Sequence, residues 1–116
     1  MHNFKKLKIW TESMELVSES YKITRNFPKF ETYGLMSQMN RCAVSIPSNI
    51  SEGTSKSTNK HFNNYLEHSL GSAFEWETQL NVAFNQEYLS EEKFNELEDK
   101  IKQIQKMITS FKSRLK

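Results

Sequence analysis

Histidine, cysteine and serine are the residue types in this sequence from which catalysis or metal binding could be built. His61 and His68 lie seven residues apart, which is two helical turns or about 10 Å, so they cannot share one metal ion. Cys42 has no histidine near it in sequence to act as a base. Ser72 lies outside any nucleophile-elbow context, and the three glycines are too scattered to form a phosphate-binding loop. The sequence therefore predicts no catalytic residue, no metal site, no cofactor and no small-molecule substrate.

Cations could instead form a binding surface, because they gather towards the ends of the chain. The net charge is only +2, from 16 basic and 14 acidic residues, but residues 100–116 carry six basic and no acidic side chains. This distribution permits contact with a nucleic-acid backbone, and an ordinary solvated face is the alternative. The cations expected to form a surface for nucleic acid or another partner are Lys5, Lys6, Lys8, Arg41, Lys102, Lys106 and Lys116.

The elements that must position these cations are helices. The chain of 116 residues contains three glycines and two prolines and is rich in helix-forming residues, so we expect one all-α domain over residues 1–116. Its single cysteine favours a reducing, cytoplasmic location. No signal peptide or membrane span is visible in the sequence.

Apolar residues recur with helical spacing in four segments. The predicted helices cover about residues 7–27, 33–52, 59–86 and 91–115, with Ser90 as the N-cap of the last. In the first helix the stripe expected to face the core is Leu7, Trp10, Met14, Val17, Tyr21 and Thr24. Four amphipathic helices joined by short loops predict an antiparallel up-down-up-down four-helix bundle.

The first helix carries a second apolar stripe. Ile9, Leu16 and Ile23 recur every seven residues, about 130° around the helix from the first stripe. One bundle core cannot receive both stripes, so the second either lies under loops or forms a subunit interface. We favour the interface, and expect it to consist of Ile9, Leu16, Ile23, Leu70 and Phe74.

Pro47 interrupts the second predicted helix. It either begins a separate short helix or kinks one continuous helix, with the freed carbonyl of Ala43 bonded to water or to a hydroxyl such as Ser45 or Ser48. The third helix carries a patch of small residues, including Ser69 and Ala73, that would let a bent helix approach closely. We therefore expect a proline-kinked second helix.

The stretch around this proline also carries a resemblance. It reads Gln38-x-x-Arg41-x-Ala43-Val44-Ser45-Ile46-Pro47-Ser48-Asn49-Ile50-x-Glu52-Gly53, accompanied by Phe27-Pro28, Glu31-x-Tyr33-Gly34-Leu35, Gly71-Ser72-x-x-Glu75 and Glu87-Tyr88-Leu89. This pattern, which spans nearly the whole chain, resembles the bacterial four-helix-bundle family also called the 23S rRNA intervening-sequence or S23 proteins.

The resemblance implies a homopentamer around a central channel, with no enzymatic activity. Some members are encoded inside intervening sequences of 23S rRNA genes. A relative, the accessory variability protein of diversity-generating retroelements, is a basic barrel that binds a reverse transcriptase and nucleic acid. The partners to expect are therefore further copies of this chain and RNA, DNA, a reverse transcriptase or a ribosomal component.

The motif residues expected to have a structural role are Arg41, Ser45, Pro47, Asn49, Glu52 and Gly53. Asn49 and Glu52 could cap freed backbone groups or pair with Arg41 of the same or a neighbouring subunit, and because a buried unpaired Glu52 would be costly we expect it to have a partner. Gly53 should end the second helix as its C′ residue. A functional role for Asn49 and Glu52 is the alternative. The family commonly has two adjacent basic residues where this chain has Asn40 and Arg41. This departure weakens the analogy to nucleic-acid binding.

These observations predict a non-enzymatic bacterial scaffold or adaptor that forms an oligomer. It would serve as an RNA- or DNA-binding accessory factor. A protein-interaction hub without nucleic-acid contact is the alternative.

Overall fold

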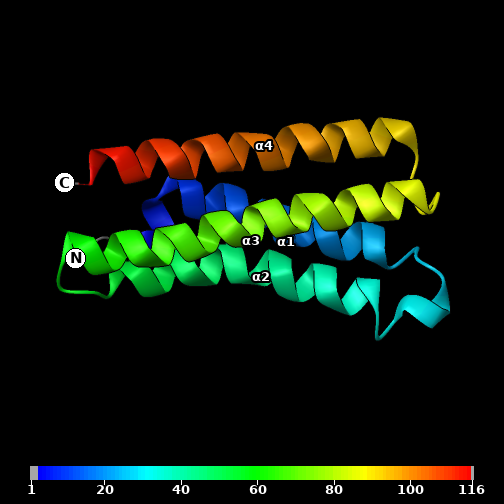
Figure 1. Ribbon diagram of the computed structural model, residues 1–116, viewed down its shortest axis with the longest axis horizontal. Helices are drawn as coiled ribbons and strands as arrows, with labels where there is room; N and C mark the ends of the chain where they lie inside the picture. Colours follow the sequence, from blue (N-terminus) through cyan, green and yellow to red (C-terminus); the bar gives the residue numbers. More distant parts are fainter. Residues whose placement is uncertain (1–2, 116) are drawn as a thin grey trace.

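The computed structural model describes residues 3–115 and consists of four long helices, each antiparallel to the next (Figure 1). The helices are α1 (Lys8–Thr24), α2 (Leu35–Thr54), α3 (Asn59–Asn85) and α4 (Glu91–Arg114), and two short 3-10 turns are η1 (Phe4–Lys6) and η2 (Lys29–Glu31). No strand occurs between residues 3 and 115, so the predicted all-α four-helix bundle is confirmed. Because the number of helices is even, both ends of the chain lie at the same end of the bundle, beside the α2–α3 loop (Figure 1).

The starts of α3 and α4 follow the expected capping chemistry. The hydroxyl oxygen of Ser90 accepts a hydrogen bond from the backbone N–H of Lys93 at 3.1 Å, and Thr58 does the same for His61 at 3.2 Å. Each cap satisfies one N–H group that the first helical turn cannot bond internally. The predicted N-cap of α4 is therefore confirmed.

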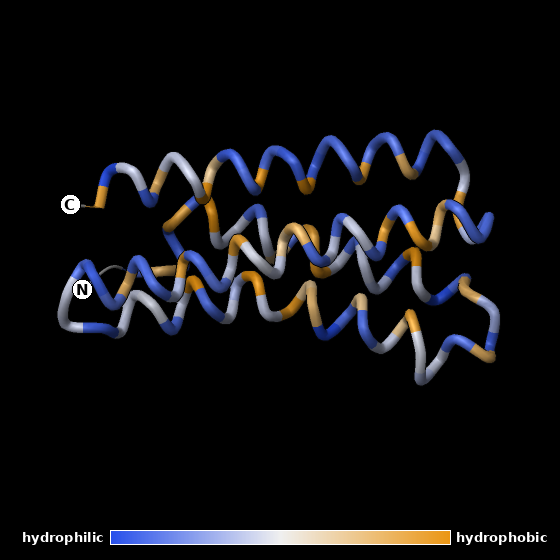
Figure 2. Tube along the Cα trace, viewed as in Figure 1, coloured by the Kyte–Doolittle hydropathy of each residue, from blue (hydrophilic) through white to orange (hydrophobic). Residues whose placement is uncertain are grey.

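The apolar stripes of α3 and α4 face the core as predicted. Along α4 the apolar positions recur on the side towards the other helices, and hydrophilic positions cover the rest of its surface (Figure 2). The residues of these two helices that contribute the largest buried side chains are Leu66, Trp76, Leu80, Leu97, Ile101, Ile104 and Ile108.

The two stripes of α1 do not have the roles predicted for them, since the second lies in the core and the first lies there only in part, with Thr24 buried. Ile9, Leu16 and Ile23 are only 4%, 0% and 6% exposed, so they belong to the core of the single chain and the prediction that they form a subunit interface is wrong. Met14 and Tyr21, expected in the core, are each 41% exposed. The core-facing stripe is completed by two serines, Ser13 and Ser20, which a count of apolar residues alone misses.

Buried polar side chains explain how serine can occupy a core stripe. The indole N–H of Trp76 donates to Ser20 Oγ at 3.1 Å, and Ser20 Oγ donates to Asn40 Oδ1 at 2.9 Å. The amide nitrogen of Asn40 donates to Thr24 Oγ1 at 3.0 Å. This network joins α1, α2 and α3, and because its groups bond one another, their burial does not carry the cost of an unsatisfied polar group.

Pro47 lies inside the continuous helix α2, so the interpretation as a separate short helix is wrong; the kink itself stays a prediction. The hydroxyl expected to bond the carbonyl of Ala43 is used otherwise, since Ser45 Oγ donates to the carbonyl of Cys42 at 2.6 Å. On the facing helix, Ser69 Oγ donates to the carbonyl of Ile46 at 2.8 Å. The small residues of α3 thus tie it to α2 beside the proline.

Gly53 has a different role from the one predicted. It lies within α2 rather than after it, and a side chain there would come within 2.8 Å of the Phe62 ring and 3.0 Å of Tyr65 Cβ. Glycine therefore allows the end of α2 to approach the start of α3. Gly71, by contrast, is exposed and has nothing within 4 Å of such a position.

Candidate functional site

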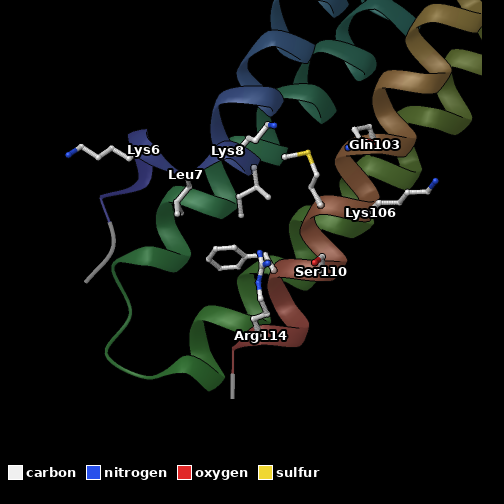
Figure 3. A pocket seen from close by; sticks show the side chains of 10 residues that line it. Lys6, Leu7, Lys8, Gln103, Lys106, Ser110 and Arg114 are labelled. Atoms are coloured by element: carbon white, nitrogen blue, oxygen red, sulfur yellow. The ribbon is translucent and has the colours of Figure 1, made fainter.

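A groove separates the start of the chain from the second half of α4 (Figure 3). It has a volume of about 490 Å³. Its apolar lining residues are Leu7, Ile9, Met107 and Phe111, and its polar ones are Gln103 and Ser110. Four cationic side chains, Lys6, Lys8, Lys106 and Arg114, complete the lining. We call this feature the basic groove.

The cations enter the basic groove from both walls. Lys6 and Lys8 come from the N-terminal segment, and Lys106 and Arg114 come from α4 (Figure 3). Arg114 reaches towards the space between the walls, whereas Lys6 and Lys106 extend outwards from the rims (Figure 3). No acidic side chain lines the groove, and within residues 3–115 no ion pair neutralises these four cations. The arrangement combines an apolar floor with a positively charged rim.

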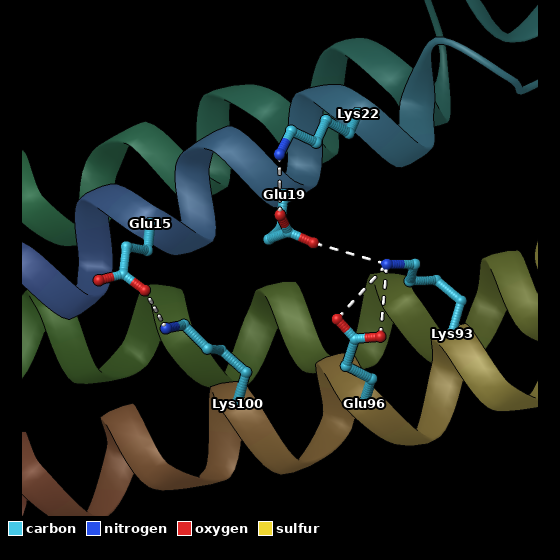
Figure 4. Close-up of polar contacts among 6 residues, drawn as sticks. All are labelled: Glu15, Glu19, Lys22, Lys93, Glu96 and Lys100. Carbon is cyan, nitrogen blue, oxygen red and sulfur yellow. Dashed lines mark hydrogen bonds and ion pairs between the residues drawn. The ribbon is translucent and has the colours of Figure 1, made fainter.

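The α1–α4 seam, the line along which these two helices face each other, is neutralised farther from the chain ends. Lys100 Nζ lies 3.1 Å from Glu12 Oε1 and 2.9 Å from Glu15 Oε1. Lys93 pairs with Glu96 of α4 and, across the seam, with Glu19 (Figure 4). Burial opposes the charge of Lys100, but its hydrogen bonds to Glu15 and Glu12 outweigh this and raise its pKa.

The other predicted cations do not join the groove. Lys5 is exposed on η1, and Arg41 is exposed on α2. Lys102 lies one turn from Lys106 but outside the groove, where it pairs with Glu98 at 3.8 Å. Lys116 lies outside the described residues. Three of the seven predicted cations, Lys6, Lys8 and Lys106, are therefore brought together.

Arg114 is a groove residue that the sequence analysis missed. A signal for it exists, because Lys106, Ser110 and Arg114 are spaced four residues apart and so follow one face of α4. These three residues lie on the face of α4 that is opposite the start of α1.

Part of the motif around Pro47 (residues 38–53) has a structural role. Asn49 Nδ2 donates to the carbonyl of Ser45 at 2.8 Å, one turn earlier in α2. Glu52 and Arg41 are both exposed, and no ion pair joins them in the part of the chain that the structure describes. Within one chain the position of Glu52 on α2 turns its carboxylate towards solvent, and its pairing with Arg41 of a neighbouring subunit stays a prediction.

Asn40, the departure from the family pattern, is a core residue. It is 7% exposed and bonded to Ser20 and Thr24. The asparagine at this position therefore removes no surface cation, and the weakened analogy to nucleic-acid binding does not follow from it.

The thiol and imidazole groups that the structure describes belong to Cys42, His61 and His68. Burial, with Glu75 beside it, raises the pKa of the Cys42 thiol to about 12, so the reactive thiolate is scarce at neutral pH. His61 and His68 are exposed. Over residues 3–115 no three His, Cys, Asp or Glu side chains are grouped so that they could hold a metal ion. Over the same residues no helix is both long and apolar enough to cross a membrane.

Comparisons with known proteins agree with this architecture. The model of a protein family described as 23S rRNA-intervening sequence protein matches residues 5–110. A crystal structure of a protein of unknown function from the S23 ribosomal protein family of Bacteroides thetaiotaomicron superposes with a TM-score of 0.80. The two sequences are 24% identical, and the alignment covers 90% of this chain and 97% of the other, which shows a shared fold. The curated proteins yield no match.

Proposed function

The chain belongs to the family of 23S rRNA-intervening sequence proteins, and on this premise we propose that it is a non-enzymatic accessory factor that binds a nucleic-acid backbone in the basic groove. The observation that carries the proposal is that four cationic residues, Lys6, Lys8, Lys106 and Arg114, line one groove without an acid. Phosphate contacts by such cations release counterions and supply affinity that does not depend on sequence.

The electrostatic cost of the groove supports the same proposal. Like charges that line one groove repel each other, and the fold gains nothing from that repulsion. The α1–α4 seam shows that this chain can place glutamates opposite lysines, as it does for Lys100. Four cations that have no such partner among residues 3–115 are therefore better explained by a ligand than by stability.

A matched pair of lysines on α4 tests the proposal. Binding of a fluorescein-labelled single-stranded RNA should be followed by fluorescence anisotropy over a series of salt concentrations. Lys106→Ala should weaken binding severalfold and lower the slope of log affinity against log salt by about one phosphate contact. Lys102→Ala, one turn away and outside the groove, should leave both unchanged. Binding that is insensitive to salt, or equally weakened by both variants, would contradict the proposal.

A second candidate function, self-association as a scaffold, is favoured by the apolar surface between α1 and α2. Trp10, Met14 and Val17 of α1 adjoin Val44 and Pro47 of α2 in a shallow groove. Exposed apolar side chains that gather on one surface are typical of an interface between subunits. This surface replaces the Ile9, Leu16 and Ile23 stripe as the proposed contact for the oligomer, which the family resemblance implies is a pentamer.

Light scattering tests this second candidate. The double variant Met14→Glu with Val44→Glu should reduce the measured mass from that of an oligomer to that of one chain, because the new charges would be buried in the contact. Val82→Glu, which changes an exposed valine on α3, should leave the mass unchanged. A parent protein that already has the mass of one chain would refute the scaffold.

A further inference from the structure

A second hollow adjoins the basic groove on the other side of α4. It has a volume of about 400 Å³ and is lined by Phe74, Gln105, Lys106, Thr109, Ser110 and Ser113. Lys106 and Ser110 line both hollows. The second half of α4 is therefore a ridge with a hollow on either side, and Lys106 is the cation that lines both hollows.

Each hollow contains one phenylalanine. Phe111 lines the basic groove and is half-buried, with its ring centroid 5.7 Å from that of Phe62. Phe74 lines the second hollow and is 53% exposed. A phenylalanine this exposed contributes little to the core of the chain, so its ring is available to a ligand.

We propose that the ligand is a single strand of nucleic acid that crosses α4, with one base against Phe111, another against Phe74 and a phosphate at Lys106. This inference rests on the proposed function and adds to it the form of the ligand. Bases in a duplex are stacked and paired with one another, so their faces cannot reach the floor of a hollow. Single-strand binding proteins combine cations for the backbone with aromatic rings for the bases, and both occur here.

The size and chemistry of the two hollows agree with this ligand. Each volume is within the range of sites that bind one small molecule, which is the scale of one nucleotide. The polar lining around Lys106 consists of amide and hydroxyl groups, namely Gln103, Gln105, Thr109, Ser110 and Ser113. These groups are uncharged, so they do not repel phosphate and impose no strong choice of base.

The experiment compares four labelled probes by fluorescence anisotropy. They are a single-stranded RNA 12-mer, the DNA 12-mer of the same sequence, the corresponding DNA duplex and an abasic 12-mer that keeps the phosphates but lacks the bases. We expect the two base-bearing single strands to bind roughly a hundredfold more tightly than the duplex and the abasic strand, which is about tenfold for each of the two base–aromatic contacts. The RNA and DNA strands show whether the sugar contributes.

Phe74→Ala tests whether the Phe74 ring contacts a base. It should weaken binding of the base-bearing strands roughly tenfold and leave the abasic strand unchanged. Val82→Ala, which shortens another exposed residue of α3 outside both hollows, should change neither. Equal, salt-dependent binding of all probes would overturn the single-strand inference but retain the proposed phosphate contact. Failure of every probe to bind would refute both.

Discussion

The two ends of the α1–α4 seam are built from the same pair of helices but treat their lysines in opposite ways. At the neutralised end, Lys100 lies between Glu12 and Glu15 at 3.1 and 2.9 Å (Figure 4 shows the pair with Glu15). At the other end, the segment that faces α4 has lysines at positions 6 and 8 and no acid before Glu12. The groove is positively charged because the first glutamate of α1, Glu12, comes after the lysines at positions 6 and 8.

The lysines at the two ends also differ in whether they can contribute to stability or to binding. A lysine held by two carboxylates has its charge compensated within the fold, and it has little field left for an external anion. A lysine without a carboxylate partner keeps its electrostatic field and repels the neighbouring cations. If this distinction is right, a substitution that raises stability should lower nucleic-acid affinity, and a substitution that lowers stability should raise it.

The largest effect is expected when the open end is made to resemble the neutralised end. Lys8→Glu replaces a groove cation by an anion in the first turn of α1. Nucleic-acid affinity should fall about tenfold or more, since one phosphate contact is lost and a repulsive charge is gained. Stability should rise by about 0.3–1 kcal/mol, because an acid near a helix N-terminus is favourable and the repulsion of one cation in the groove is removed.

Thermal unfolding and anisotropy titration of this variant give the two quantities. Lys60→Glu in the first turn of α3 is the control, since it makes the same charge change near a helix start that is outside the groove. It should also gain stability but should keep most of its affinity. A Lys8→Glu protein that loses stability, or that binds as well as its parent, would break the comparison.

An intermediate effect is expected when the neutralised end is opened. The double variant Glu12→Gln with Glu15→Gln leaves Lys100, whose side chain is only 23% exposed, without a carboxylate partner. We expect a loss of about 1 kcal/mol, or about 4 °C in the midpoint of thermal unfolding. Affinity for nucleic acid should increase slightly, because the positive field extends along the seam.

Glu98→Gln is the control for the opened seam. It removes the partner of Lys102, whose side chain is 52% exposed, so its effect on the unfolding midpoint should be small. Equal destabilisation by the control and the double variant would show that the contacts of Lys100 contribute no more than an ordinary surface ion pair.

The sequence could predict α4 better than α1, and the reason is physical. The core stripe of α4 is apolar at every turn, from Phe94 to Ile108, so counting apolar residues finds it. The core stripe of α1 includes Ser13 and Ser20, which are buried because their hydroxyls bond a backbone carbonyl and Asn40. Ser13 bonds Ile9 within α1, whereas Ser20 depends on Asn40 of α2, which spacing along α1 does not reveal.

The candidate site could be predicted only in part for a related reason. The local excess of cations in residues 1–11 and 100–116 is visible in the sequence, and it identifies Lys6, Lys8 and Lys106. Which cations remain without an acid depends on the register of α1 against α4. Lys100 and Lys106 look equivalent in sequence, yet only Lys100 lies opposite glutamates.

The smallest effect is expected from a polar contact outside the seam, where pH can switch a single carboxylate. Glu31, in the α1–α2 connection, accepts hydrogen bonds from the backbone N–H of Leu35 at 3.0 Å and from the hydroxyl of Tyr88 at 2.8 Å. The Leu35 bond first, and the Tyr88 bond second, lower the pKa of Glu31 below its ordinary 4.5. The same contact raises the pKa of Tyr88 above 10.

These shifts fix the sign of the pH dependence. A carboxyl whose pKa is lowered by folding stabilises the fold above its unfolded-state pKa, and this contribution disappears as pH falls through the folded value. Tyr88→Phe should therefore lower the unfolding midpoint slightly at pH 7, and the difference from the parent should shrink below about pH 4.5. Tyr21→Phe, at an exposed tyrosine of α1, should show no such change. A Tyr88→Phe difference that persists unchanged at pH 3 would mean that the Tyr88 hydroxyl stabilises this connection independently of the charge on Glu31.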